Sequence, residues 1–306
     1  MKLSIIIVSW NTRELTLKCL KSIFSCLEKT LDYEIFLVDN NSSDNMVEAA
    51  TELTHEQDFV AQDFSPNTLN IIKNKQNLGF AKANNIAIKQ AKGDYILLLN
   101  SDTELIDNSL NKMIEFIDTN NKIGIVGPKL INTDGTLQRS CRRFPGLVDQ
   151  LFIQLKFYNF WPNKIPAIKK YFMLDFMHDK AQEVDQVMGA AMLIKKKVIN
   201  KIGLLDEKFW VHFEEVDFCK RAKDVGWQTY FYPDTQIVHH KEASFKQIAS
   251  FYKQINFNYS LRYYFKKHKP FWQLLVLCLI QPINLFLIWV DSMLGIRNKV
   301  GKRKDL

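Results

Sequence analysis

The sequence predicts an α/β fold in which helices flank a mainly parallel central sheet. Short apolar segments alternate with segments of helical periodicity, and several apolar segments end abruptly in polar residues. The clearest case is residues 95–99, which are followed by Asn100, Ser101 and Asp102. A short apolar run between turn residues is typical of a strand buried in a parallel sheet. Ligands bind beyond the carboxyl ends of such strands, so these three residues are candidate ligand-binding groups.

The first 128 residues repeat a strand–helix pattern. Residues 13–28 place apolar side chains on one helical face, and Ser42, Ser43 and Asp44 offer caps for a further helix. Repeated units of this kind favour right-handed crossovers and therefore a mainly parallel sheet. The predicted strands cover residues 3–9, 33–38, 69–74, 95–100 and 123–128, and the other predicted helices cover residues 80–91 and 108–119.

The regular pattern is interrupted after residue 128. Residues 129–183 contain scattered prolines and aromatic residues with weak periodicity, so we expect an irregular excursion over the sheet. Regular structure returns at residues 184–196, in a helix ended by Gly226 and in a strand at 228–233. We predict one domain over residues 1–245, with halves at 1–128 and 129–245, and a helical extension over residues 246–306.

Composition limits the classes of partner and compartment. The chain has 306 residues, a formal net charge of +8 and no nucleic-acid-binding motif, so we expect anionic partners other than nucleic acid. Its 5 cysteines show no CxxC or CxxH spacing, which fits a reducing compartment without structural zinc. The first apolar run is too short for a signal-peptide core, so we expect a cytoplasmic location.

Residues 271–290 form an uncharged apolar segment that is long enough, as a helix, to cross a membrane. Pro282 and Asn284 lie near its middle, and basic residues cluster on both sides, at 262–269 and 297–304. A simple span would leave one cluster on the wrong side of the membrane. We therefore expect a helix or broken hairpin lying on the inner face of the plasma membrane, with a true span and a buried core helix as alternatives.

The familiar phosphate-binding motifs are missing. No GxGxxG follows the first strand and no GxxxxGK[ST] occurs, so a nucleotide diphosphate at this sheet would need a divalent cation. Asp102 is the natural ligand, unless it only caps the following turn. His239 and His240 follow another predicted strand end and offer a second ligand, or else are ordinary structural histidines. Only one should face the site, because adjacent residues of an extended chain point to opposite faces.

Other strand ends and one helix start carry further candidates. Asp39 would accept hydrogen bonds from a nucleobase or ribose, or else form an Asx-turn. Asn77 and Gly79 suit either a turn or a close approach of the backbone to a ligand. The carboxylates Glu214, Glu215 and Asp217 lie at a helix start, where the dipole alone favours acidic residues, but one of them would also serve as a general base.

Taken in order, these segments resemble an inverting glycosyltransferase of family 2 with the GT-A fold, in the bacterial rhamnosyltransferase-like branch. The resemblance covers about residues 2–245 and implies a nucleotide-sugar-binding half at 1–128 and an acceptor-binding half at 129–245. The segments that carry it are SIIIVSWN, VDNNSSD, NLGFAKANN, LLLNSD, DGTLQRSCRRFP, VMGAAMLI, FWVHFEEVDFCKRAKDVGW and VHHKEAS.

The resemblance implies roles for the matching residues. Asp102 and His239 would hold Mg²⁺ or Mn²⁺, and Glu215 would be the catalytic base. The nucleotide sugar would contact Asp39, Asn77, Gly79, Asn100, Ser101 and Asp102. The acceptor or the sugar would contact Arg142, Arg143, Gly189, Ala190, Trp210, Glu214 and Asp217. Two departures matter: Asn100 replaces the first aspartate of the metal motif, and Glu215 replaces the usual aspartate base, which leaves Glu214, Glu215 and Asp217 as candidates.

The implied reaction is a single displacement with inversion at the anomeric carbon. The expected donor is a dTDP- or UDP-linked sugar, with L-rhamnose from dTDP-rhamnose as the first choice, and the expected acceptor is a glycan or lipid-linked hydroxyl in cell-surface polysaccharide synthesis. Arg142 and Arg143 would hold a lipid diphosphate, or else form a solvated basic turn. The alternatives are a nucleotidyltransferase and a catalytically inactive nucleotide- or glycan-binding module at the membrane.

Overall fold

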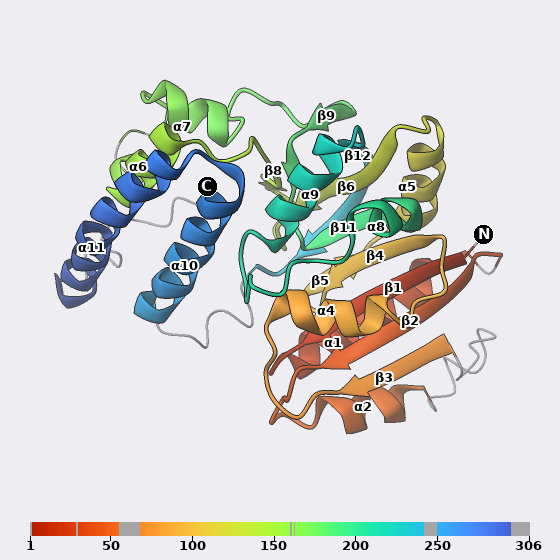
Figure 1. The fold of residues 1–306 in the computed structure, drawn as a ribbon. Helices are drawn as coiled ribbons and strands as arrows, with labels where there is room; N and C mark the ends of the chain where they lie inside the picture. The colour runs from red at the N-terminus through yellow and green to blue at the C-terminus, as the bar shows by residue number, and fades with distance from the viewer. Residues whose placement is uncertain are drawn as a thin grey trace.

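Figure 1 shows the fold in a computed structural model, which describes residues 2–28, 30–54, 68–159, 161, 163–241 and 250–294. The strands are β1 Lys2–Ser9, β2 Asp32–Asp39, β3 Leu69–Lys73, β4 Tyr95–Asn100, β5 Thr103–Leu105, β6 Ile123–Ile131, β7 Leu137–Gln138, β8 Cys141–Arg142, β9 Gln182–Val184, β10 Gln186–Val187, β11 Ala191–Lys195 and β12 Gln228–His239. The helices are α1 Arg13–Cys26, α2 Met46–Leu53, α4 Phe80–Ile88, α5 Ser109–Asp118, α6 Leu147–Gln154, α7 Pro166–Tyr171, α8 Lys196–Ile202, α9 Glu214–Asp224, α10 Ser250–His268 and α11 Phe271–Leu294, with a 3₁₀ turn η2 at Phe157–Asn159.

The main sheet has the strand order β3-β2-β1-β4-β11-β6-β12-β5. Strands β3, β2, β1 and β4 are parallel neighbours, β11 is antiparallel to both β4 and β6, and β12 is parallel to β6. The predicted mainly parallel sheet is confirmed. Since β12 runs in the direction of β4, Asn100 and His239 end at the same edge, and β11 starts at that edge after Gly189 and Ala190.

Helices cover both faces of the sheet (Figure 1). Helices α1, α2 and α5 pack on one face, where their apolar residues join Ile5 and Ile7 of β1 in one buried cluster. Helices α4, α8 and α9 pack on the other face with Ile6. Successive residues of β1 thus enter opposite cores, which explains why the strand reads as continuously apolar.

Two expectations for local structure are wrong. Residues 129–183 are not simply irregular, since they contain α6 and α7 as well as the short strands β7, β8 and β9. The buried residues of α6 are Gln150 and Gln154, so the apolar periodicity that reveals a helix is missing. The predicted caps of the second helix are also wrong, because α2 begins after Asn45 without a side-chain cap, and Asp44 instead accepts the backbone N–H of Arg13 at 2.8 Å.

Helices α10 and α11 form an antiparallel hairpin beside α6 (Figure 1). Helix α11 continues through Pro282, so of the helix and the broken hairpin expected within residues 271–290, the structure has the helix. It is the single helix among the described residues that is long and apolar enough to cross a membrane, and only 22% of its most apolar window is buried, which argues against a core helix. The basic cluster at residues 297–304 lies outside the described residues.

Candidate active site

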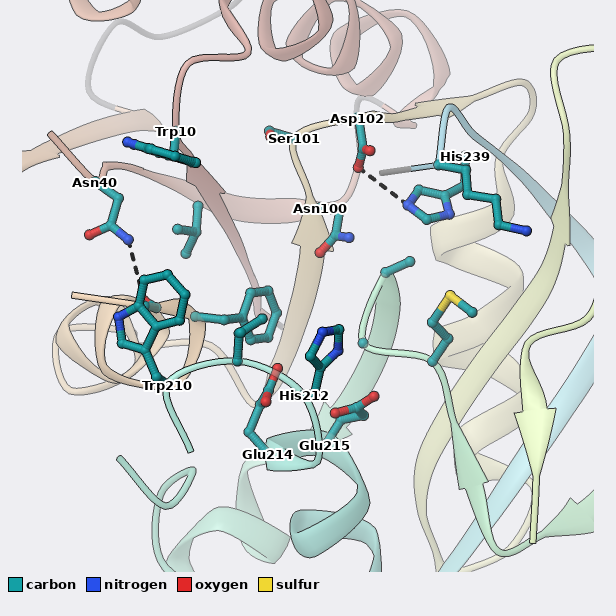
Figure 2. Close-up of a pocket in the computed structure, with 18 of the residues that line it drawn as sticks. Trp10, Asn40, Asn100, Ser101, Asp102, Trp210, His212, Glu214, Glu215 and His239 are labelled. Atoms are coloured by element: carbon teal, nitrogen blue, oxygen red, sulfur yellow. Dashed lines mark hydrogen bonds and ion pairs between the residues drawn. The ribbon is translucent and has the colours of Figure 1, made fainter. Parts of the chain in front are cut away.

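A cavity of about 380 Å³ opens at the edge of the sheet where β1, β4 and β12 end (Figure 2). The predicted site residues that line it are Asn77, Gly79, Asn100, Ser101, Asp102, Arg142, Gly189, Ala190, Trp210, Glu214, Glu215 and His239. The predicted Asp39, Arg143 and Asp217 do not line it. The structure therefore brings most of the predicted residues together around one space.

Asp102 and His239 face each other at this cavity, with Nε2 of His239 3.3 Å from Oδ1 of Asp102. Nδ1 of His239 contacts the amide oxygen of Gln138 at 2.6 Å, and an amide oxygen only accepts, so the ring proton is assigned to Nδ1. Nε2 is buried and has no hydrogen-bond partner among the described residues. Its lone pair points toward a carboxylate oxygen, and a cation or a proton between them makes that contact favourable.

The donor set of this pair fits a divalent cation. Ligands at adjacent corners of an octahedral site, each about 2.1 Å from the metal, lie about 3 Å apart, close to the observed separation. Among the described residues no three His, Cys, Asp or Glu side chains gather closely enough to hold a metal ion. A cation here would take further ligands from water or a phosphate-bearing substrate, as Mg²⁺ commonly does. His240 instead contacts Glu104 at 2.6 Å, so the two histidines diverge as expected.

The end of β4 is tied to its neighbours by hydrogen bonds. The backbone N–H of Asn100 donates to the carbonyl of Ala190 at 2.8 Å, which fixes the end of β4 against the start of β11. Oγ of Ser101 lies 3.0 Å from Oγ1 of Thr12, in a network of buried hydroxyls at the turn from β1 into α1. Figure 2 shows the Asn100 side chain facing the cavity below Asp102. Asn100 therefore offers its amide to a ligand, whereas Ser101 is engaged with the protein.

Asp39 stabilises a turn at the end of β2. Its Oδ1 accepts the backbone N–H of Ser42 at 3.0 Å, which is the Asx-type alternative allowed by the sequence. The next residue, Asn40, lines the cavity instead. Its Nδ2 donates to Oδ1 of Asn77 at 2.8 Å and its Oδ1 accepts the N–H of Leu78 at 3.0 Å. Asn40 thus fixes the loop that leads into α4.

Gly79 lies where this loop meets the opposite wall of the cavity. Its φ of +77° favours glycine, and an added Cβ would overlap the backbone carbonyl oxygen of Trp210. The N–H of Phe80 donates to that same carbonyl at 2.8 Å. The requirement for glycine therefore comes from a contact between the two walls.

The wall that contains Trp210 continues into a strained turn before α9. His212 and Phe213 have φ values of +67° and +69°, a left-handed conformation that side-chain-bearing residues rarely adopt. Burial, followed by the nearby charges of Arg142 and Lys253, lowers the pKa of His212 to about 4. His212 therefore presents a neutral imidazole to the cavity beside Glu214 and Glu215 (Figure 2).

Glu214 and Glu215 begin α9 and both line the cavity. Each has a buried Oε2 without a hydrogen-bond partner among the described residues. Burial and then the neighbouring charge of Glu215 raise the pKa of Glu214 well above its usual value. Burial also raises the pKa of Glu215, but backbone hydrogen bonds and the charge of Arg142 oppose this rise. Burial thus favours the neutral form of both carboxyls, and the charge of Arg142 opposes this at Glu215.

Asp217 and Arg143 point away from the cavity. The fully buried Asp217 carboxylate is 2.7 Å from Nε of Arg221, 2.8 Å from Nζ of Lys267 and 2.7 Å from Nε2 of His268. Nη1 of Arg143 lies 4.0 Å from Asp185. Asp217 therefore cannot reach a ligand in this cavity, and of the three predicted carboxylates only Glu214 and Glu215 line it.

Several lining residues were not assigned from the sequence: Trp10, Asn40, Gln138, Arg139 and His212. Asn40 adjoins the strand-end Asp39, and Gln138 and Arg139 lie in a segment that carried the family resemblance. Their closeness to a recognised motif could therefore have identified them as candidate site residues. His212 also lies in such a segment, but its exposure to the cavity depends on the left-handed turn, which the sequence pattern does not predict.

The relatives of this chain include named sugar transferases. The family model described as Glycosyl transferase family 2 matches residues 4–203. The N-acetylglucosaminyl-diphospho-decaprenol L-rhamnosyltransferase of Mycobacterium tuberculosis is 23% identical over 221 residues, which cover 69% of this chain and 67% of that protein. The low-salt glycan biosynthesis hexosyltransferase Agl10 of Haloferax volcanii is 24% identical over 225 residues, which cover 72% of this chain and 61% of that protein.

Solved structures of similar fold cover most of the chain. The mannosyltransferase PcManGT from Pyrobaculum calidifontis, in complex with GDP-Man and Mn²⁺, matches with a TM-score of 0.58 at 15% identity, over 95% of this chain and 75% of that one. GalNAc-T7 with UDP, GalNAc and Mn²⁺ matches with a TM-score of 0.56 at 15% identity, over 78% of this chain and 44% of that one. The predicted GT-A fold is confirmed, and since the family model covers more than half of the sequence, the chain belongs to glycosyl transferase family 2.

Proposed function

We propose that this protein is an inverting glycosyltransferase that moves a sugar from a nucleotide diphosphate to a hydroxyl of a glycan or lipid-linked acceptor in cell-surface polysaccharide synthesis. One observation carries the proposal: a single cavity is lined by Asp102 and His239 on one wall and by Glu214 and Glu215 on the other. The first pair suits the diphosphate that leaves, and the second suits the hydroxyl that attacks.

The donor would bind against the ends of β1 and β4. Asp102 and His239 would hold Mg²⁺ or Mn²⁺, which when bound supplies positive charge to the departing diphosphate. The Mn²⁺ in the two similar solved structures supports a cation of this kind. We propose dTDP-rhamnose as the first donor to test, because the mycobacterial relative is named as an L-rhamnosyltransferase, and a UDP-linked sugar as the second.

Glu215 would be the base, and it would take the proton of the acceptor hydroxyl. Burial raises the pKa of both carboxyls, but the charge of Arg142 opposes the rise at Glu215, whereas the charge of Glu215 adds to it at Glu214. A protonated Glu214 would donate a hydrogen bond to a sugar hydroxyl. The acceptor oxygen then attacks the anomeric carbon while the bond from that carbon to the diphosphate breaks, so the configuration inverts.

The acceptor side of the cavity combines a small residue with positive charge. A Cβ on Gly189 would be no closer than 3.7 Å to its neighbours, so a sugar ring has room to approach the backbone there. Arg139, Arg142 and Lys241 line the same cavity, and Arg142 stacks over the ring of Phe172 at 5.4 Å. This positive charge suits a diphosphate group on the acceptor. The mycobacterial relative is named for an acceptor of this kind, N-acetylglucosaminyl-diphospho-decaprenol. We assign that contact to Arg142 and not to Arg143.

We further propose that the hairpin of α10 and α11 attaches the protein to the inner face of the plasma membrane. Its buried contacts include polar ones, since Nδ2 of Asn258 donates to Oδ1 of Asn284 at 3.1 Å and Nδ2 of Asn284 donates to the Gln154 carbonyl at 2.7 Å. Its outer face is apolar, with side chains at least 47% exposed at Phe271, Trp272, Leu275, Leu279, Ile283, Phe286 and Trp289. A hairpin whose outer face is this apolar suits a lipid surface better than water.

Co-sedimentation with anionic lipid vesicles tests this attachment. Replacing Leu279 and Phe286 by glutamate should release the protein from the vesicles, because both side chains face outward. Vesicle binding that is unchanged in this double variant would remove the membrane role of the hairpin.

The predicted division of the chain into a domain over residues 1–245 and an extension over residues 246–306 stays a prediction.

The transfer reaction is tested with purified protein, a panel of nucleotide sugars and a lipid-linked acceptor, with Mn²⁺ present. We expect one donor to yield a glycosylated acceptor and a nucleoside diphosphate. Binding of a donor without transfer or hydrolysis would instead support the inactive module, for which Asn100 in the metal motif is the motivating observation. Membership in family 2 leaves the nucleotidyltransferase alternative without support.

A further inference from the structure

Residues 206–217 include the wall of the cavity that is formed by Trp210, Val211, His212, Glu214 and Glu215. The wall includes two adjacent left-handed residues, His212 and Phe213. Conformations of this kind persist only where the surrounding structure holds them. The contacts that hold this wall therefore decide whether its polar side chains face the cavity.

Helix α10 supplies many of these contacts. Oγ of Ser260, a buried residue, donates to the backbone carbonyl of Val211 at 2.8 Å, immediately before the left-handed pair. Nζ of Lys267 lies 2.7 Å from Asp206 and 2.8 Å from Asp217. Ser260 thus holds the middle of the wall, and Lys267 bridges its two ends.

Aromatic packing reinforces the same contact. The ring of Phe213 packs against Phe257 and Tyr264 of α10, with centroid distances of 5.3 and 5.6 Å. Phe209 packs against Tyr263 at 4.8 Å. Phe209 and Phe213 also share one buried cluster with Leu277 of α11, so the wall and the hairpin have a common core.

We propose that Ser260 and Lys267 are positioning residues: through them the C-terminal hairpin holds residues 206–217 so that His212, Glu214 and Glu215 point into the cavity. The expected effect of these contacts on the rate of transfer rests on the proposed function, whereas their effect on the conformation of residues 206–217 does not. A hairpin that served only as a membrane attachment would have no need of these contacts, because they lie on its side facing the catalytic wall.

The test compares Ser260→Ala and Lys267→Gln with Asn258→Ala in the full-length chain. Asn258→Ala is the matched control, because it removes a buried hydrogen bond between α10 and α11 without touching residues 206–217. Lys267 is partly exposed, with a side-chain accessibility of 28%, so its substitution keeps the proposal testable if Ser260→Ala does not fold. The measurements are kcat, the donor KM, and hydrogen–deuterium exchange of the peptide containing residues 206–217.

We expect Ser260→Ala and Lys267→Gln each to lower kcat about tenfold with little change in donor KM, because small displacements of reacting groups cost large factors in rate. Both should also speed amide exchange in residues 206–217, and Asn258→Ala should change neither quantity. Unchanged exchange in the two variants, or an equal loss in the control, would overturn the proposal. If no sugar is transferred by the wild-type protein, the proposed function fails and the exchange measurement alone still decides this inference.

Discussion

The two walls of the cavity are held in place by different means. The wall to which we assign donor binding, called the donor wall below, consists of the ends of β1, β4 and β12, which the hydrogen bonds of the sheet fix directly. The wall with Glu214 and Glu215 follows a strained turn that depends on contacts from α10, more than forty residues later in the chain. Short-range sequence patterns reveal the first kind of wall, whereas the second kind depends on tertiary packing. Changes at the first wall should therefore affect donor binding, whereas changes at the second should affect the chemical step.

The largest expected effect is the loss of the base on the α10-supported wall. Glu215→Gln keeps the size of the side chain but removes its ability to accept a proton, so transfer should fall about 1000-fold. The measurement is the initial rate of acceptor glycosylation. Glu52→Gln, on the exposed surface of α2, is the control and should keep the wild-type rate. A rate near wild type in Glu215→Gln would move the base to Glu214.

The next effect concerns the cation on the donor wall. EDTA should lower transfer about 100-fold, and added Mn²⁺ or Mg²⁺ should restore it, because the diphosphate would otherwise leave without a neutralising charge. Asp102→Asn should raise the Mn²⁺ concentration needed for half-maximal rate. His240→Gln is the control, since His240 contacts Glu104 and not the cavity. Full activity in chelator would exclude a cation requirement.

A smaller effect is expected where the two walls meet. Gly79→Ala forces a Cβ into the Trp210 carbonyl, so we expect transfer to fall about tenfold through displacement of both walls. Gly135→Ala is a close control, because Gly135 has a similar φ of +79° but no neighbour within 4 Å of an added Cβ. Equal losses in both variants would assign the effect to backbone strain and not to the contact.

The last expected effect is on stability and not on transfer, at Asp217. Burial opposes its ionisation, but hydrogen bonds from His268 and Lys267 and the charge of Arg221 lower its pKa to about 2. The pKa of an aspartate in the unfolded chain is about 3.9, so the lowered pKa stabilises the fold at pH values above about 3.9. This stabilisation is lost as the pH falls toward 2. Asp217→Asn should therefore lower the free energy of unfolding by about 2 kcal/mol at pH 7.

Urea unfolding at pH 7 and pH 3 measures this difference. The gap between wild type and Asp217→Asn should shrink at pH 3, whereas Asp234→Asn, at an exposed position, should show no gap at either pH. A gap that stays constant with pH would mean that ionisation of Asp217 does not stabilise the fold.

Sequence patterns predicted the sheet and most of the donor wall for a physical reason. A buried parallel strand must be apolar throughout, so its polar end stands out, as at Asn100 and Asp102. The same logic failed at α6, where the helix buries Gln150 and Gln154. Asp39 and Asn40 show the limit of resolution: the pattern found the strand end, but hydrogen bonds decided which of the two residues faces the cavity.

The central claim is that donor binding belongs to the strand ends and sugar transfer to the wall held by α10. Calorimetric titration of the same nucleotide sugar, with Mn²⁺ present, into Asp102→Asn and Glu215→Gln tests this claim most directly. We predict that Asp102→Asn raises the Kd of the donor at least about tenfold, since a lost charge-assisted contact costs about that much, whereas Glu215→Gln leaves the Kd unchanged. Equal weakening of donor binding in both variants would contradict the division.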